Sequence, residues 1–158
     1  MNVNLDSESS ERMNESPPGV THLERECFCD RDDITELIMP DSLTSIGVMC
    51  FQTMENLTKI VLSTNLKRIG FESFSFLRNS QLKEIVIPDS VTRIEGVVCK
   101  RCPQLTAITV PTHWEFHSDR FFNNRAEFSS FQLPESVVKV NGKQLNDMIL
   151  NILTFQHM

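Results

Sequence analysis

Two cysteines and two histidines that are close in the sequence could form a zinc site. Cys99 and Cys102 are separated by two residues, and after ten intervening residues His113 and His117 follow with three residues between them. This order is similar to that of a two-cysteine, two-histidine zinc finger, in which thiolates and imidazoles hold the metal. A finger needs its histidines on a helix, whereas the extended run ITVP ends at Pro111, two residues before His113. Zinc binding by these four residues is therefore the alternative interpretation.

Catalytic chemistry has few candidates elsewhere in the chain. A thiol nucleophile could be drawn from Cys99 or Cys102 with His113 or His117 as its base. No glycine-rich phosphate loop is present, and the chain has 5 glycines in total. We therefore expect no enzymatic activity and no cofactor.

The elements that position these residues belong to a repeat. A sequence motif of about 23 residues recurs along the chain. Its clearest copy is LKEIVIPDSVTRIEGVVCKRCPQ, residues 82–104. The copies begin at Ile34, Leu57, Leu82, Leu105 and Phe128, at steps of 23, 25, 23 and 23 residues. Self-similarity at such a period is typical of a solenoid, in which each turn stacks on its neighbours.

Each copy begins with an apolar pattern that predicts a strand. Positions 1, 4 and 6 are apolar, and proline usually follows at position 7, where it ends the strand. The sets are Ile34, Leu37, Met39, Pro40; Leu57, Ile60, Leu62; Leu82, Ile85, Ile87, Pro88; Leu105, Ile108, Val110, Pro111; and Phe128, Phe131, Leu133, Pro134.

Further apolar residues follow at positions 10, 13, 17, 18 and 21. Cys99 and Cys102 fall at positions 18 and 21, where sister copies carry phenylalanine, methionine or leucine. Core packing is therefore the preferred interpretation of both cysteines, ahead of zinc. Cys27 and Cys50 share position 17 one turn apart, close enough for a disulfide. We favour free thiols, because the cysteine count of 5 is odd and no signal peptide is visible.

The motif resembles the BspA-type leucine-rich repeats of bacterial surface adhesins and parasitic protists. ITELIMPDSLTSIG and LKEIVIPDSVTRIEG carry the resemblance. It implies a leucine-rich-repeat solenoid, a parallel β-sheet coil with short helical or 3-10 segments. It also implies binding of proteins or attachment to surfaces, without catalytic residues.

Three segments are expected along the chain. Residues 1–16 are acidic and rich in Ser, Asn and Glu, which predicts a mobile segment. Residues 17–141 hold about five to six turns of the repeat. Residues 142–158 carry apolar side chains at helical spacing, which predicts a C-terminal helix that caps the last turn.

The open face of the predicted sheet is the candidate binding site. Its position 5 carries an apolar stripe of Ile38, Val61 and Val86, followed by Thr109 and Gln132. Its position 3 carries charges of alternating sign, namely Glu36, Lys59 and Glu84, followed by Ala107 and Ser130.

The fourth copy departs from the pattern. Trp114 stands at position 10 and His117 at position 13, and we expect Trp114 and Phe116 to be exposed contacts. The irregular stretch 112–125 is thus a second place to look for specificity. A further hypothesis is a basic edge, formed by Lys67, Arg68, Arg93, Lys100 and Arg101.

Composition limits the partners. The net charge of -6 disfavours nucleic acid, and no apolar run is long enough to span a membrane. The expected partner is a protein. The predicted face, roughly 480 Å² for five strands, is smaller than the ~800 Å² that each partner of a stable complex buries, so self-association could add area. We expect a cytoplasmic location, with the cell surface, reached without a signal peptide, as the alternative.

Overall fold

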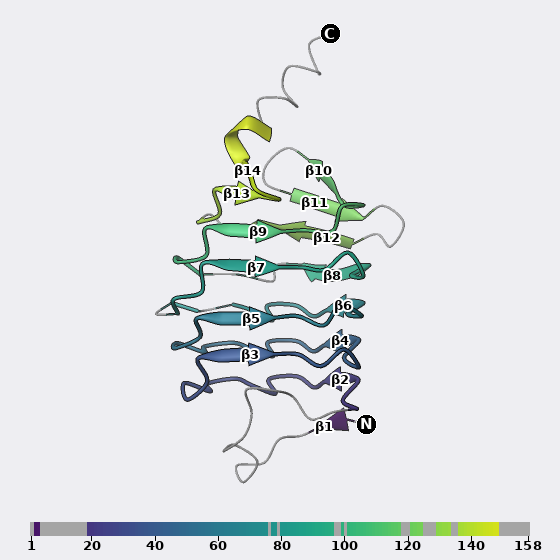
Figure 1. Cartoon of the computed structure of the whole chain (residues 1–158), viewed down its shortest axis with the longest axis vertical. Coiled ribbons are helices and arrows are strands. Elements are labelled where there is room, and N and C mark those ends of the chain that lie inside the picture. Colours follow the sequence, from purple (N-terminus) through teal and green to yellow (C-terminus); the bar gives the residue numbers. More distant parts are fainter. Residues whose placement is uncertain are drawn as a thin grey trace.

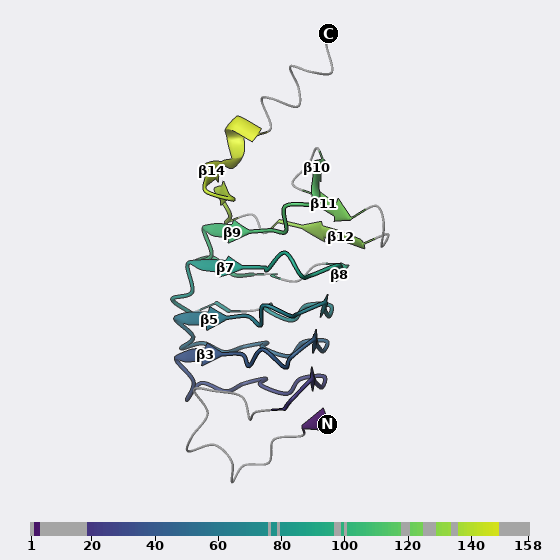
Figure 2. The same ribbon diagram turned by 45° about the vertical axis from the view of Figure 1, so that its right-hand side comes forward.

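The chain coils into a solenoid whose turns stack along one axis (Figure 1). The computed structural model describes residues 2–3, 19–75, 77–78, 80–96, 99, 101–117, 121–124, 129–133 and 136–148. Each regular turn contributes one strand to each of two parallel arrays that flank the core (Figure 2). The predicted solenoid is confirmed, with about four turns in place of the expected five to six.

The first array lies on the face that the sequence selects for binding. Its regular strands are β3 (Glu36–Ile38), β5 (Lys59–Val61), β7 (Glu84–Val86) and β9 (Ala107–Thr109). Equal repeat positions pair between neighbours, as Leu37 does with Ile60 and Ile85 with Ile108. The repeat register therefore places like residues above one another.

The second array runs along the other side of the core and is continuous. It consists of β2 (His22–Leu23), β4 (Ser45–Ile46), β6 (Arg68–Ile69) and β8 (Arg93–Gly96). These strands pair in parallel and join one sheet in the order β2-β4-β6-β8. Position 13 of each turn lies on the inner side, where Ile46 and Ile69 are buried.

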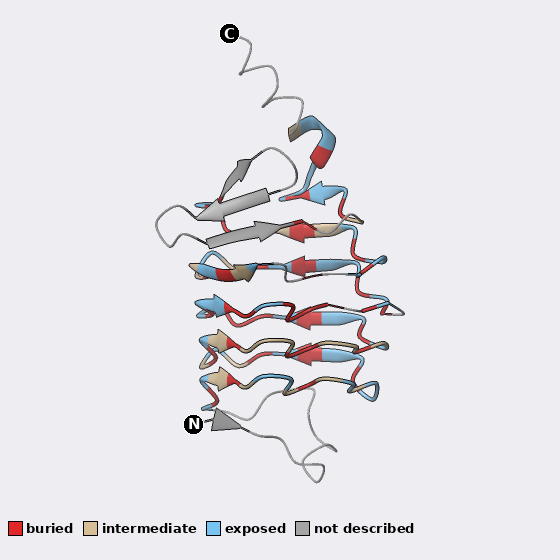
Figure 3. Cartoon of the chain, turned by 180° about the vertical axis from the view of Figure 1, so that it is seen from behind, coloured by how far each residue is buried: buried red, intermediate tan, exposed pale blue. Residues whose placement is uncertain are grey.

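The core is one apolar column filled by all turns together. Phe28, Phe51 and Phe74, all at position 18, stack with ring centroids 5.5 Å and 5.1 Å apart. Cys99 takes the same position in the next turn and is buried. Buried and exposed residues alternate along the strands of the first array (Figure 3). A single turn could not bury its apolar side chains, so each turn depends on its neighbours.

The first array is divided between β5 and β7. Strands β3 and β5 pair with each other, and β7 pairs with β9. Over residues 58–62 and 83–87, which are all described, no strand pairing joins β5 to β7. The step from Lys59 to Glu84 is 25 residues long, in place of the usual 23. Ser63, which replaces the proline of position 7 here, is buried. We call this division the seam.

The predicted register of the last copy is wrong. The segment that begins at Phe128 was expected to continue the first array, but β12 (Ser129–Gln132) pairs with β8 of the second array. The next strand of the first array is β13 (Lys139–Val140), in which Lys139 pairs with Ala107, 32 residues earlier. Ser130 and Gln132 therefore do not belong to the first array.

The extra residues of this turn form an antiparallel unit. Strand β10 (Glu115–His117) pairs with β11 (Phe121–Asn124), and β11 pairs with β12. The irregular stretch noted in the sequence is thus an insertion that extends the second array. It lies at the C-terminal end of the stack (Figure 1).

The two ends differ from expectation in detail. Near the N-terminus, β1 (Asn2–Val3) pairs in parallel with β2, so part of segment 1–16 is a strand; residues 4–16 lie outside the described residues. At the other end, β14 (Lys143–Gln144) pairs with β13, and helical structure begins at Leu145. The helix is described to Met148, and the rest of the predicted cap lies outside the described part.

The connections after the second array are turns in the described residues, so the helical content expected of short helical or 3-10 segments is small. Glu26, Met49 and Glu72, all at position 16, have φ of 58°, 56° and 53°. The same left-handed conformation therefore recurs at one corner of successive turns.

Candidate protein-binding face

Three apolar side chains lie exposed in a row on neighbouring strands of the first array. Ile38 on β3, Val61 on β5 and Val86 on β7 are 39%, 41% and 52% exposed. The residue before each of them is buried, because successive side chains of a strand point to opposite sides. The row therefore lies on the outer side of the array, at position 5 of each turn. The pairing of Ile38 with Val61 shows that the first two members are direct neighbours.

A row of charges runs beside the apolar stripe. Glu36, Lys59 and Glu84 are exposed at position 3 of the same strands, and the Nζ of Lys59 lies 3.9 Å from the Oε2 of Glu36. An exposed pair of this kind contributes little to stability, of order 0–1 kcal/mol. The charges thus stay accessible to a partner. We define the strand face by positions 3 and 5 of four strands: Glu36, Ile38, Lys59, Val61, Glu84, Val86, Ala107 and Thr109.

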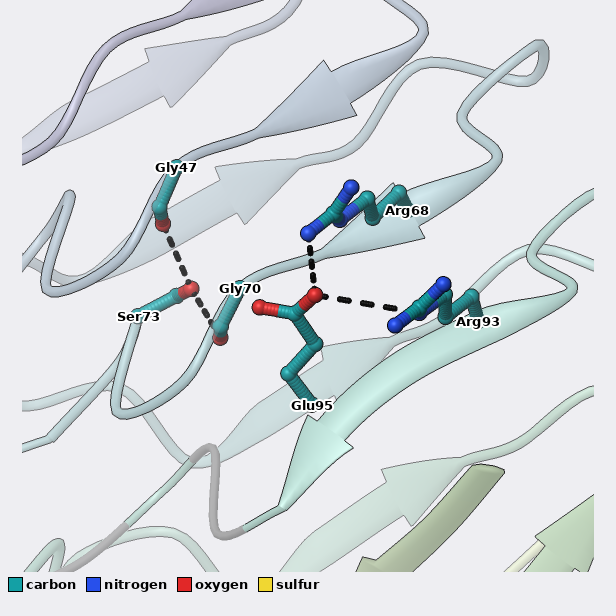
Figure 4. A network of polar contacts seen from close by, with 6 residues as sticks. All are labelled: Gly47, Arg68, Gly70, Ser73, Arg93 and Glu95. Carbon is teal, nitrogen blue, oxygen red and sulfur yellow. Dashed lines mark hydrogen bonds and ion pairs between the residues drawn. The ribbon is translucent and has the colours of Figure 1, made fainter. Parts of the chain in front are cut away.

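Two members of the predicted basic edge, Arg68 and Arg93, lie on the second array and are partly neutralised. Arg68 and Arg93 are paired neighbours on β6 and β8, and Glu95 accepts from Arg68 and lies 3.7 Å from Arg93 (Figure 4). The carboxylate offsets the repulsion between two adjacent guanidinium groups. Lys100 lies outside the described residues. This arrangement favours a structural role for the two arginines over binding of an acidic partner.

The expectation that Trp114 is an exposed contact is wrong. Trp114 is 6% exposed, and its indole Nε1–H donates to the carbonyl oxygen of Val91 at 3.2 Å. Val91 occupies position 10 of the preceding turn, so the indole fills the core site that the repeat assigns to it. Phe116 lies in β10, but its side chain is outside the described part.

The structure does not bring the four zinc candidates together in the part that it describes. Cys99 and Cys102 are buried, and the Sγ of Cys102 donates to the carbonyl oxygen of Phe74 at 2.9 Å. His113 is exposed in the turn before β10. Among the described residues, no three side chains of the metal-ligating types lie close enough to hold an ion. The burial of both cysteines agrees with the core positions predicted for them.

All five cysteines are free thiols, and their environments differ. A hydrogen bond from Cys50 lowers the pKa of the Cys27 thiol, which is half-buried. Burial raises the pKa of Cys50, Cys99 and Cys102. Of Cys27 and Cys50, which occupy the same repeat position in successive turns, Cys27 is therefore the thiol that ionises first, while Cys50 stays protonated.

Two exposed apolar residues were missed by the sequence interpretation. Phe71 follows the second array at the corner after Gly70, and Val138 lies just before β13. Phe71 could have been found, because it is a large apolar side chain at position 15, where the pattern demands none. Val138 could not have been found, because the wrong register of the last copy did not place it beside the first array.

Comparison with known proteins identifies the repeat and the fold. The family model described as BspA type leucine-rich repeat region matches residues 21–151 in six copies. A leucine-rich repeat protein of T. pallidum is similar in structure, with 17% identity and a TM-score of 0.51 over 85% of this chain and 76% of that one.

A second solved structure, a leucine-rich repeat protein from Bacteroides ovatus, matches with 17% identity and a TM-score of 0.36 over 80% of this chain and 46% of that one. No significant match was found among curated protein sequences. No helix in the described part of the chain is long and apolar enough to span a bilayer.

Proposed function

We propose that this chain is a non-enzymatic module that binds another protein through the strand face. The proposal starts from its family, since the chain belongs to the BspA-type leucine-rich repeat family. Proteins built from leucine-rich repeats are generally binding modules. One observation supports this choice of surface: Ile38, Val61 and Val86 are exposed at the same position of three successive turns, whereas the apolar positions 1, 4 and 6 of those turns are buried. A contiguous apolar row with charged neighbours is typical of a contact surface.

The chemistry of the face indicates what a partner must offer. Apolar side chains would cover the stripe, and charges of alternating sign would lie against Glu36, Lys59 and Glu84. Because the face is small, its affinity depends on how well a few central side chains are buried. Val61 and Val86 lie in the middle of the face and are the expected anchors.

The test is a pair of substitutions on the face. Val61→Asp and Val86→Asp together should abolish binding of a protein captured from the source cell, identified by mass spectrometry and then purified. The thermal unfolding curve followed by circular dichroism should change little, because both side chains are exposed.

Val138→Asp is the matched control. Val138 is 51% exposed and lies beside the first array, but outside the strand face. The substitution places an aspartate at one exposed valine, in place of two, without touching the stripe. If the purified partner binds the double variant as well as it binds the unaltered protein, the strand face is not the binding surface.

A further inference from the structure

We propose that the strand face binds the strand face of a second copy of this chain, about a two-fold axis that runs parallel to the strands and passes over the seam. The inference rests on the proposed function, because it names a partner for the same surface. Closed two-fold dimers are self-complementary, so one patch must present matching halves to itself. The strand face meets this condition in one particular register.

The position of the axis determines which residues meet. An axis parallel to the strands keeps their direction and reverses their stacking order in the partner. With the axis between β5 and β7, β5 lies opposite β7 of the partner, and β3 lies opposite β9 of the partner. Repeat positions are then retained, so position 3 meets position 3 and position 5 meets position 5.

The residues that meet in this register are complementary. Lys59 lies opposite the partner's Glu84, and the pair occurs twice because of the symmetry. Val61 lies opposite the partner's Val86, again twice, so the most exposed part of the stripe is covered. At the margins, Ile38 meets the partner's Thr109 and Glu36 meets the partner's Ala107. No like charges are opposed, and opposite charges across an interface favour association.

Other registers are less favourable. An axis over β5 places Lys59 against itself and Glu36 against the partner's Glu84, so every charged contact is repulsive. An axis over β7 places Glu84 against itself. An axis between β3 and β5 pairs Glu36 with the partner's Lys59, but it leaves Val86, the most exposed member of the stripe, opposite no described strand.

The size of the face determines how strong the dimer can be. Counted over repeat positions 1–6 of the four turns, which extend beyond the strands themselves, the face offers roughly 400 Å² per copy, about half of what a stable complex buries on each partner. We therefore expect a weak dimer that forms at high protein concentration. Sedimentation velocity between about 10 µM and 1 mM should show a concentration-dependent shift from monomer to dimer.

Charge exchange tests the register directly. Lys59→Glu brings a glutamate opposite the partner's Glu84, and Glu84→Lys brings a lysine opposite the partner's Lys59. Each variant alone should therefore lose at least about tenfold in association constant. In an equimolar mixture, one chain carries glutamate at both positions and the other carries lysine at both, so every charged contact between them is attractive. The mixture should recover the dimer, which also shows that both variants are folded.

Lys67→Glu is the control, because Lys67 is exposed beside β6 of the second array; it should dimerise like the unaltered protein. The inference is overturned if the unaltered protein stays monomeric at about 1 mM, if Glu84→Lys dimerises normally, or if the mixture stays monomeric. The proposed function fails separately, when the variant with Val61→Asp and Val86→Asp retains a purified foreign partner at concentrations below the dimer range.

Discussion

Gly70 lies so close to Gly47 of the preceding turn that a Cβ atom on Gly70 would be 2.6 Å from the carbonyl carbon of Gly47. Gly47 in turn lies against Glu24, whose carbonyl carbon would be 2.7 Å from a Cβ on Gly47. Glycine at position 14 thus permits the close stacking of these turns. In the next turn the equivalent residue is Glu95, and there β8 has 4 residues, whereas β4 and β6 have 2 each.

Gly70→Ala is expected to destabilise the solenoid strongly. The added methyl group would overlap with the backbone of Gly47 and Val48, which cannot move without separating two turns. We expect the free energy of unfolding to fall by about 2–4 kcal/mol in chemical denaturation. Gly19→Ala is the control, because a Cβ there meets no atom within 4 Å and only its φ of 89° is unfavourable. Equal losses for the two variants would contradict steric overlap as the cause.

Trp114 should behave as a buried residue in fluorescence. It is the chain's 1 tryptophan, so the emission reports on this site alone. Native protein should emit at shorter wavelength than unfolded protein and resist quenching by iodide. Trp114→Phe removes the hydrogen bond to Val91 and should lower stability by about 1 kcal/mol. Quenching of the native protein as efficient as that of the unfolded chain would show that the indole is exposed.

The repeat register explains why the core could be predicted and the last turn could not. In the regular copies, position 4 holds Leu37, Ile60, Ile85 and Ile108, and all four are buried as the apolar period requires. The register that begins at Phe128 predicts Val137 and Val140 at positions 10 and 13, but the strand pairing places them at positions 1 and 4. Both pairs of positions are three residues apart, so the pattern alone fits either assignment. The insertion that shifts them is visible only in the strand pairing.

The candidate site was also predictable only in part. Alternation along a strand is a local property, and it placed Ile38, Val61 and Val86 on the outer side correctly. The seam that crosses the same face could not be predicted from local sequence. It depends on whether β5 and β7, which are distant in the sequence, pair with each other. The exposure assigned to Trp114 failed for another reason. Its position 10 indicated a buried site, but the enrichment of aromatic residues at binding hot spots and the irregular sequence around Trp114 suggested an exposed contact.

Alkaline pH should destabilise the protein through its buried thiols. Burial raises the pKa of the Cys102 thiol from its ordinary value of 9.0, which applies in the unfolded chain, to about 11. The stabilisation is therefore complete below the unfolded pKa and is lost as the pH rises towards the folded pKa. By linkage, ionisation of this thiol alone lowers the free energy of unfolding by roughly 3 kcal/mol as the pH rises from 9.0 to about 11.

Denaturant unfolding at a series of pH values measures this loss. Cys102→Ala should reduce the slope of stability against pH in that range, whatever its effect at neutral pH. Ser80→Ala is the control, because Ser80 is buried and polar but does not titrate there; it should retain the full slope. An unchanged slope in Cys102→Ala would mean that this thiol is not buried as described.

The seam between β5 and β7 should appear in amide hydrogen exchange. Three buried residues occupy position 6 of successive turns, namely Met39, Leu62 and Ile87. The Met39 N–H donates to Val61 O at 2.9 Å and the Ile87 N–H to Thr109 O at 2.9 Å, whereas no described backbone carbonyl accepts from Leu62. Because protection requires a hydrogen bond that must open, the Leu62 amide should exchange at least about tenfold faster than the other two. Measurement by NMR at low protein concentration avoids protection by a dimer, and equal protection at all three amides would show that the ladder continues across the seam.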